Sequence, residues 1–411
     1  MLLILSRGLY IGGVPRAMKI TSIESIPLRF EYERGFEYAG GKCTGRVTHL
    51  VRVHTDTGQT GIGSVYTHPG LAHLIIKHQL EPLLLGEDAT EVERLWDRMY
   101  RLTRWYGRKG AAMSALGALD TAFWDLRGQA EGQPVWRMLG GSSGQCPAYG
   151  SALLWKKPEA LAKEARELIE RGFRRVKMRL GRDPDFDKQA TAAVRNAIGS
   201  EHDLLIDGSM RYGPDTARRL ALMLEKHNCF WLEEPFEPEN LDAFAALRKE
   251  ANIPLAAGEN EFGEQGFREL IRAGAVDIIQ PDASRCGGIT EVIRAADLAA
   301  TAGLKVATHS WSDAIAILAN AHVIAAHPAG LTVEVDQAGN PFVENLLKQP
   351  LQIEDGMLTL PDAPGLGIEL DESVIEKHRL PDPLALPDGA YSDMLFGADH
   401  WNPAPPYPAG D

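Results

Sequence analysis

The spacing of apolar residues changes twice along the chain. Between residues 18 and 66, apolar and polar residues alternate in short segments, two of which are joined by the turn sequence TGQTG. A period of two is typical of half-buried strands, and a glycine-containing turn between two such segments indicates a hairpin. From residue 71 to residue 139 the apolar residues recur at helical spacing instead. This part of the chain is therefore predicted to be an α+β domain, in which a sheet is followed by helices.

From about residue 147 onward, helical patterns alternate with short apolar runs. The runs are RRVKMRL, DLLID, CFWLEE, IPLAAGE, AVDIIQPD, LKVATH and LTVEVD. Strand–helix alternation in units of about 25–30 residues predicts right-handed crossovers and a parallel sheet. Seven or eight consecutive units favour a (β/α)8-type barrel over an open sheet. No Gly-x-Gly-x-x-Gly opens the first unit, which argues against a dinucleotide-binding fold.

These changes of pattern predict four segments. Residues 1–17 form an extension, residues 18–141 the α+β domain and residues 142–347 the barrel. Residues 348–411 contain strand-like pieces that we expect to return to the first domain, and then a proline-rich tail. No apolar run approaches the ~20 residues that a helix needs to span a bilayer, so we expect no membrane partner.

Composition narrows the class of protein. The chain has 411 residues, 44% of them hydrophobic and 24% charged, which is the usual mix for a soluble globular protein. The net charge of −13 argues against a nucleic-acid partner, which would need a basic face. The four cysteines stand far apart in the sequence. This usage fits a reducing, cytoplasmic location and excludes a disulfide scaffold or a cysteine zinc site.

An ionisable side chain ends every apolar run of the predicted barrel. In a β/α barrel, catalytic residues lie at the carboxyl ends of the strands. One polar residue at a strand end can simply mark the start of a loop, but a set from consecutive units is much harder to explain in this way. The set therefore predicts an active site, and its members are Lys177, Arg179, Asp207, Glu233, Glu259, Asp282, His309 and Glu334.

Three successive runs contribute carboxylates at equal spacing, namely Asp207, Glu233 and Glu259. Three acids brought together without a counter-charge would repel one another, and some would have to be protonated. A hard divalent cation such as Mg²⁺ resolves this conflict, because it prefers oxygen ligands and leaves positions open for a substrate carboxylate. Glu234 is expected to point the other way, since side chains alternate along a strand. We interpret Glu234 as a supporting or structural acid.

Asp282 and His309 end neighbouring predicted strands. An aspartate beside a histidine orients the ring and raises its basicity, which suits a general base. Such a pair can also be purely structural, but opposite three acids and a metal the catalytic interpretation is favoured. Lys177 and Arg179, separated by one residue on a strand, point into the same space. The two cations fit a proton-transfer site, an anion clamp or a solvated strand edge.

The chain contains a series of motifs by which it resembles the enolase superfamily and, within it, the mandelate racemase subgroup. The resemblance extends from Met18 to about Pro383. It implies a capping domain packed over a modified (β/α)7β barrel. The motifs are SALGALDTAFWDLRGQAEGQPVWRMLGG, VKMRLG, LLIDGS, WLEEP, AAGEN, DIIQPDASRCGGIT and VATHSW.

The resemblance also implies a reaction, the abstraction of a proton α to a carboxylate to give an enediolate. One Mg²⁺ per subunit would be held by the three strand-end acids at 207, 233 and 259, and Asp282–His309 would be the catalytic dyad. Glu334 would hydrogen-bond the substrate carboxylate. It can do so only when protonated, so its pKa is expected to be raised by burial. Ser209 stands where that subgroup often contacts the substrate.

The sequence departs from the family pattern at Arg179, where the usual motif Lys-x-Lys has its second lysine. Arginine stays charged, so it is a poor base. A racemase needs a base on each face of the substrate, whereas a dehydratase needs one base and an acid, and His309 can play both parts. Lys177 remains a candidate base, because a neighbouring guanidinium is expected to lower its pKa. Arg179 is also a candidate for binding a carboxylate or hydroxyl group of the substrate.

The loops of the predicted capping domain suggest the substrate class. Residues 30–46 and 64–70 offer hydrogen-bond donors, Tyr38 and His68 among them, and Trp311 follows closely after His309. Donor-rich loops suit a polyhydroxylated acid better than an aryl acid. The preferred hypothesis is dehydration of an aldonate or aldarate, a small-molecule carboxylate, to a 2-keto-3-deoxy acid.

Two other hypotheses remain open. A racemase, an epimerase or a lactone cycloisomerase could use the same type of site. A non-catalytic binding protein is disfavoured, because nothing structural requires three carboxylates in one cavity. Members of the superfamily that the chain resembles are usually dimers or octamers, so the resemblance implies a homo-oligomer.

Overall fold

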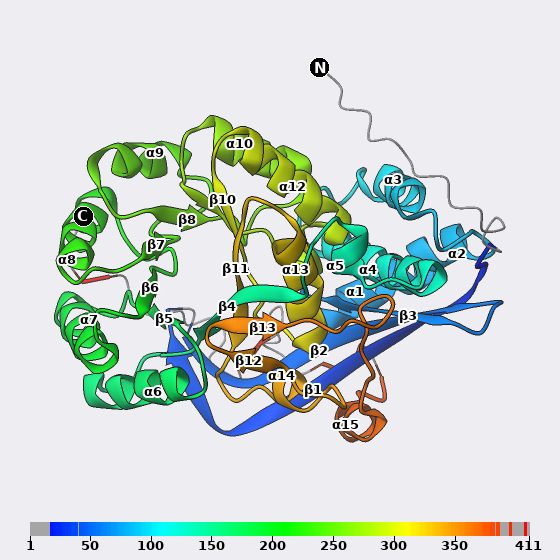
Figure 1. Cartoon of the computed structure of the whole chain (residues 1–411), viewed down its shortest axis with the longest axis horizontal. Coiled ribbons are helices and arrows are strands. Elements are labelled where there is room, and N and C mark those ends of the chain that lie inside the picture. The colour runs from blue at the N-terminus through cyan, green and yellow to red at the C-terminus, as the bar shows by residue number, and fades with distance from the viewer. Residues whose placement is uncertain (1–16, 40, 383, 387–393, 397–406, 409–411) are drawn as a thin grey trace.

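The computed structural model describes residues 17–39, 41–382, 384–386, 394–396 and 407–408 (Figure 1). Residues 1–16 of the predicted extension lie outside this range. A long antiparallel sheet with helices forms one part of the molecule, and a ring of strands surrounded by helices forms the other (Figure 1). The domain boundaries drawn from the sequence stay a prediction.

The first part, here called the cap, begins with three antiparallel strands: β1 (Ile20–Tyr38), β2 (Gly41–Thr55) and β3 (Thr60–Val65). The turn TGQTG joins β2 and β3, as predicted. The cap helices then follow in the region of helical spacing. They are α1 (Pro69–Ile75), the π-helix η1 (Ile76–Leu80), α2 (Glu81–Leu84), α3 (Val92–Thr103), α4 (Ala111–Glu131) and α5 (Val135–Met138). Helix α4 is buried along nearly its whole length, since it packs on the sheet and on the barrel.

The second part is a closed barrel of parallel strands, which confirms the predicted fold class. Each strand pairs in parallel with the next one along the chain, and β11 pairs with β4 to close the ring. The strands are β4 (Gln145–Ser151), β5 (Arg175–Arg179), β6 (Asp203–Asp207), β7 (Trp231–Glu233), β8 (Leu255–Ala257), β9 (Ile278–Ile279), β10 (Lys305–Thr308) and β11 (Gly330–Asp336).

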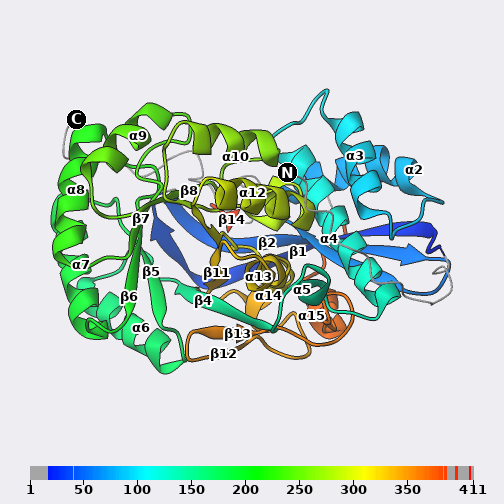
Figure 2. The same cartoon turned by 45° about the horizontal axis from the view of Figure 1, so that its top comes forward.

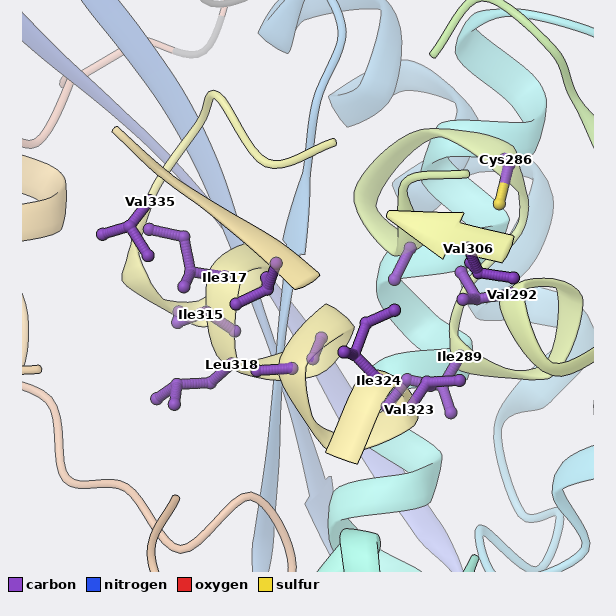
Figure 3. Close-up of a cluster of buried hydrophobic side chains, with 14 of the residues drawn as sticks. Cys286, Ile289, Val292, Val306, Ile315, Ile317, Leu318, Val323, Ile324 and Val335 are labelled. Carbon is purple, nitrogen blue, oxygen red and sulfur yellow. The ribbon is translucent and has the colours of Figure 1, made fainter. Parts of the chain in front are cut away.

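Helices connect these strands around the outside of the barrel (Figure 2). They are α6 (Pro158–Glu170), α7 (Pro184–Ile198), α8 (Pro214–Lys226), α9 (Leu241–Glu250), α10 (Gly263–Arg272), the short α11 (Ala283–Cys286), α12 (Ile289–Thr301) and α13 (Ala314–Ala326). Figure 3 shows the apolar layer between strands and helices, where Val306 of β10 lies beside Val292 of α12. Helix α13 is almost entirely apolar, and its residues from Ala314 to Ile324 are all buried.

The chain after the barrel returns to both parts. It contains α14 (Pro341–Glu344), β12 (Gln352–Glu354), β13 (Met357–Thr359), α15 (Glu372–His378) and β14 (Met394–Leu395). Strand β13 pairs with the start of β4, and β14 pairs with β2 of the cap. Within the described residues, no helix is long and apolar enough to cross a membrane.

A buried polar contact joins the cap sheet to the barrel. Arg46 of β2 is fully buried, forms an ion pair with Asp336 at 2.8 Å and donates to the carbonyl oxygen of Trp311. Thr48 and the serine at position 64 of β3 both donate to the carboxylate of Asp313. The cap therefore holds the loop that follows β10.

We expect Arg46→Met to destabilise the protein by about 3–5 kcal/mol, because it leaves the Asp336 carboxylate buried without its cation. The double variant Arg46→Met/Asp336→Asn removes both charges and should recover much of the loss. Urea unfolding of the three proteins measures both effects. A double variant as unstable as the sum of its single variants would show that the two residues do not act as a pair.

Candidate active site

The carboxyl ends of the barrel strands bring the predicted charged residues together. Lys177 lies near the end of β5 and is completely buried. Its Nζ is 2.6 Å from Oε1 of Glu233 on β7 and 2.9 Å from Oε1 of Glu334 on β11. It is also 3.9 Å from Oδ2 of Asp207 on β6. The interpretation of Lys177 as part of a solvated strand edge is excluded by this burial.

These contacts correct two expectations about pKa. Burial by itself lowers the pKa of Lys177, but the carboxylates of Glu233 and Glu334 outweigh it and raise this pKa well above its ordinary value. The expected fall is therefore wrong, because two acids lie closer to the ammonium group than any cation does. Burial alone would likewise raise the pKa of Glu334, but Lys177, His309 and Arg179 outweigh it and lower the pKa. In this structure Glu334 is an ionised acceptor.

Arg179 ends β5 on the cap side of Lys177. It donates to Asp207, and its guanidinium carbon lies 4.6 Å from the ring centroid of Trp311 and 5.9 Å from that of Tyr38. Burial alone would lower the pKa of Arg179, but Asp207 and other carboxylates outweigh it and raise the pKa further. Arg179 is therefore a fixed positive charge between the barrel mouth and the cap, and it cannot act as a base.

The predicted dyad is present as a hydrogen-bonded pair. Nδ1 of His309 lies 2.7 Å from Oδ2 of Asp282, and both side chains are buried. The side-chain amide of Asn320 on α13 donates to the other oxygen of Asp282 and to the carbonyl of His309. The second ring nitrogen, Nε2, faces Glu259 at 3.7 Å and Glu334 at 3.9 Å. His309 is thus oriented with Nε2 toward the acids.

The three predicted metal ligands meet at this end of the barrel, on β6, on β7 and just after β8. As they stand, Asp207 is bound to Arg179 and Glu233 to Lys177, and no group of three His, Cys, Asp or Glu residues in the described part of the chain is arranged as a metal site. The donor set nevertheless fits a hard divalent cation. Asp207 and Glu233 are buried, and Glu259 is partly exposed. Burial is the main cause that raises the pKa of the adjacent Glu234 well above its ordinary value, and these three carboxylates raise it further.

Glu234 itself corrects a prediction. It was expected to point away from the site, but it is buried, accepts a hydrogen bond from Asn260 at 2.8 Å and interacts with Glu259, Asp207 and Glu233. The strand ends at Glu233, and Glu234 has a φ of +36°, so the alternation of side chains stops there. In the sequence, only the proline that follows Glu234 indicated that the strand ends here.

The four residues predicted to bind the substrate do not all lie at the barrel mouth. The backbone N–H and the hydroxyl of Ser209 both bond to Oδ1 of Asp207, so Ser209 orients that carboxylate. Tyr38 and Trp311 lie against Arg179, as described above. His68 stands at the start of α1, and within the described part of the chain no side-chain hydrogen bond or ion pair joins it to the barrel. The role of all four in binding a substrate stays a prediction.

The residues present define a class of protein: a parallel barrel whose mouth combines a histidine–aspartate dyad, a group of acids and two fixed cations beneath a cap. Residues 36–140 match the N-terminal domain of the mandelate racemase / muconate lactonizing enzymes, and residues 160–374 match the enolase C-terminal domain-like family. The chain belongs to the mandelate racemase / muconate lactonizing enzyme family of the enolase superfamily.

Individual relatives agree with this assignment. The chain is 33% identical to the D-galactarolactone cycloisomerase of Agrobacterium fabrum, over 89% of this chain and 100% of that protein. It is 31% identical to the arabinonate dehydratase of Saccharolobus solfataricus, over 80% of this chain and 89% of that protein.

Solved structures agree as well. A member of the enolase superfamily from Polaromonas sp. JS666 is 36% identical, with a TM-score of 0.84 over 89% of this chain and 98% of that one. A racemase from Streptomyces coelicolor with bound magnesium is 28% identical, with a TM-score of 0.82 over 88% of this chain and 100% of that one.

The charge of His309 predicts how stability depends on pH when no metal is bound. Burial alone would lower its pKa, but Glu259, Glu334 and Asp282 outweigh it and raise the pKa from 6.5 to about 9. A raised histidine pKa stabilises the folded state fully below about pH 6.5, and this contribution is lost as the pH rises through about 9. We expect chelator-treated protein to lose stability over this range in urea unfolding, and His309→Asn to lose less. Identical pH dependence of the two proteins would contradict the assignment.

Proposed function

We propose that this protein is a Mg²⁺-dependent dehydratase of acid sugars, which removes the proton α to a carboxylate and then the β-hydroxyl of an aldonate or aldarate. The observation that carries the proposal is the His309–Asp282 pair with Nε2 aimed at the acids, opposite two cations that stay protonated. A site with one competent base fits elimination better than racemisation, which needs a base on each face of the substrate.

The chemistry follows from the placement of His309. In its neutral form, Nε2 takes the α-proton, and the C–H electron pair gives the substrate an enediolate. Asp282 holds the Nδ1–H and stabilises the imidazolium that results. The imidazolium then returns its proton to the β-hydroxyl, which leaves as water while a double bond forms between the α and β carbons. The enol product becomes the 2-keto-3-deoxy acid.

Fixed charges support this step. Mg²⁺ held by Asp207, Glu233 and Glu259 would supply positive charge to the carboxylate of the substrate, where negative charge develops. Lys177 adds a second positive charge on the opposite side of the ring of acids. Because its ammonium lies between two carboxylates, it acts through charge and not as a base.

A second candidate function is lactone cycloisomerisation. It is favoured by the similarity to the D-galactarolactone cycloisomerase over the full length of that protein. The same proton abstraction would be followed by departure of the ring oxygen of a lactone, so that ring opening replaces the release of water. A binding protein without catalysis is less compatible with the buried dyad.

We expect purified protein with Mg²⁺ to form keto acid from at least one member of a library of aldonates, aldarates and their lactones. His309→Asn should lower turnover by about 10²- to 10⁴-fold, because it removes the general base. His327→Asn is the matched control, since His327 bonds to Asp297 outside the site. NMR in D₂O identifies the reaction. Deuterium at the α carbon without a keto signal would contradict dehydration and indicate epimerisation.

Removal of the metal provides a separate test. We expect chelation to abolish turnover and to lower the melting temperature, because a ligand that binds only the folded state stabilises it. Added Mg²⁺ should restore both, and Glu259→Gln should reduce the shift in melting temperature. Full activity and unchanged stability after chelation would contradict a magnesium site.

A further inference from the structure

Gln280 follows β9 and belongs to none of the groups assigned above. Its side chain is completely buried. Among the residues that the structure describes, neither Oε1 nor Nε2 of its carboxamide has a hydrogen-bond partner. Buried polar side chains are nearly always paired, because an unpaired amide costs about 1–3 kcal/mol. An amide left unpaired on both atoms at the mouth of a barrel therefore requires an explanation.

The strand pattern shows that Gln280 faces the interior of the barrel. Ile278 belongs to the cluster that fills the interior, together with Ala256 and Ala307. Asp282 reaches inward to His309. Gln280 lies midway between Ile278 and Asp282, and its N–H bonds to the carbonyl of Ala257, which continues the ladder between β8 and β9. Side chains two residues apart on a strand share a face, so Gln280 points inward.

The layers of side chains inside the barrel show which residues lie at the same level as Gln280. In such barrels, each interior layer takes four side chains from alternate strands. Lys177 of β5, Glu233 of β7 and Glu334 of β11 form such a layer, since the ammonium of Lys177 contacts both acids. The alternate strand that remains is β9, and Gln280 is its inward residue at this level. The fourth position of the layer is therefore an uncharged amide.

The positions beside this amide on the neighbouring strands carry small residues. In the parallel register, the position next to Gln280 on β8 is Gly258 and the position on β10 is Ala307. Neither residue fills the interior with a large side chain. A Cβ at Gly258 would lie 2.9 Å from the backbone nitrogen of Gln280, so the two strands approach closely here only because position 258 is glycine. The residues beside the carboxamide on the two neighbouring strands are thus among the smallest that a strand can offer.

The chemistry of the layer selects the kind of group. Glu233 and Glu334 are acceptors, and Lys177 is a donor. Gln280 is the member of this layer that offers both an acceptor and a donor, which is the complement of a hydroxyl beside a carboxylate. We propose that Gln280 binds the α-hydroxyl of a 2-hydroxy acid, with Oε1 accepting from the hydroxyl and Nε2 donating toward the substrate carboxylate. The inference rests on the proposed function and assigns a residue of the chain to one group of its substrate.

The test compares two ligands that cannot be dehydrated because they lack the β-hydroxyl. A 3-deoxyaldonate carries the α-hydroxyl, and the matching 2,3-dideoxyaldonate does not. Their dissociation constants are measured by calorimetry, in buffer with Mg²⁺, on the wild type, on Gln280→Met and on Thr308→Val. Thr308 is the matched control. Its buried hydroxyl is also unpaired among the described residues, but Thr308 is two residues from Val306 on β10 and so shares its outward face.

We expect the wild type and Thr308→Val to bind the 3-deoxyaldonate at least about tenfold more tightly than the dideoxy compound, and Gln280→Met to bind the two equally. Gln280→Met should also melt at the same or a higher temperature, because an apolar side chain of similar shape replaces an unpaired amide.

Three results would overturn the proposal. The first is a wild type that binds both ligands equally or binds neither. The second is an unchanged ratio of affinities in Gln280→Met. The third is a fall in the melting temperature of Gln280→Met, which would show that the resting protein already satisfies the amide. Failure of the proposed function would be seen in a separate measurement, if no keto acid formed from acid sugars that carry both the α-hydroxyl and the β-hydroxyl.

Discussion

The ion pairs of Lys177 are the interaction on which the barrel mouth depends. A completely buried ammonium lies between the carboxylates of Glu233 and Glu334. Several acids at neighbouring strand ends would repel one another without compensating charge, and burial would add a desolvation cost for each. Lys177 and Arg179 offset this repulsion from a single strand. The two cations at the end of β5 are therefore a condition for placing so many acids in one cavity.

The same end of the barrel makes the position of His309 depend on the cap. His309 lies at the end of β10, and the three residues from Trp311 to Asp313 that follow it are held by polar side chains of the cap sheet, Arg46 foremost. The ring of Trp311 lies 5.0 Å from Arg46 and 4.6 Å from Arg179, so it separates the cap's cation from the barrel's. Cap and barrel thus meet on the segment that directly follows His309, so a change in their contact would alter the position of this side chain.

The sequence allowed the fold and the strand-end residues to be predicted, because both depend on local patterns. Apolar periodicity marks each strand, and the residue that ends it lies at the barrel mouth whatever its neighbours are. The pKa of Lys177 and of Glu334 could not be predicted in this way. Their values depend on which side chains share an interior layer, and that follows from the stagger of β5, β7 and β11. Glu234 was misplaced for a related reason, since its positive φ ends the alternation that the prediction assumed.

The charge balance also limits which reactions the site can perform. Neighbouring carboxylates raise the pKa of both Lys177 and His309, but the consequences differ. Lysine begins far above neutral pH, so a further rise removes it as a base. Histidine begins near neutrality, and any positive charge bound by Glu259, which faces its Nε2, opposes the rise. The acids that keep Lys177 protonated therefore leave the pKa of His309 adjustable, which is why the proposed function is an elimination with one base and not a racemisation with two.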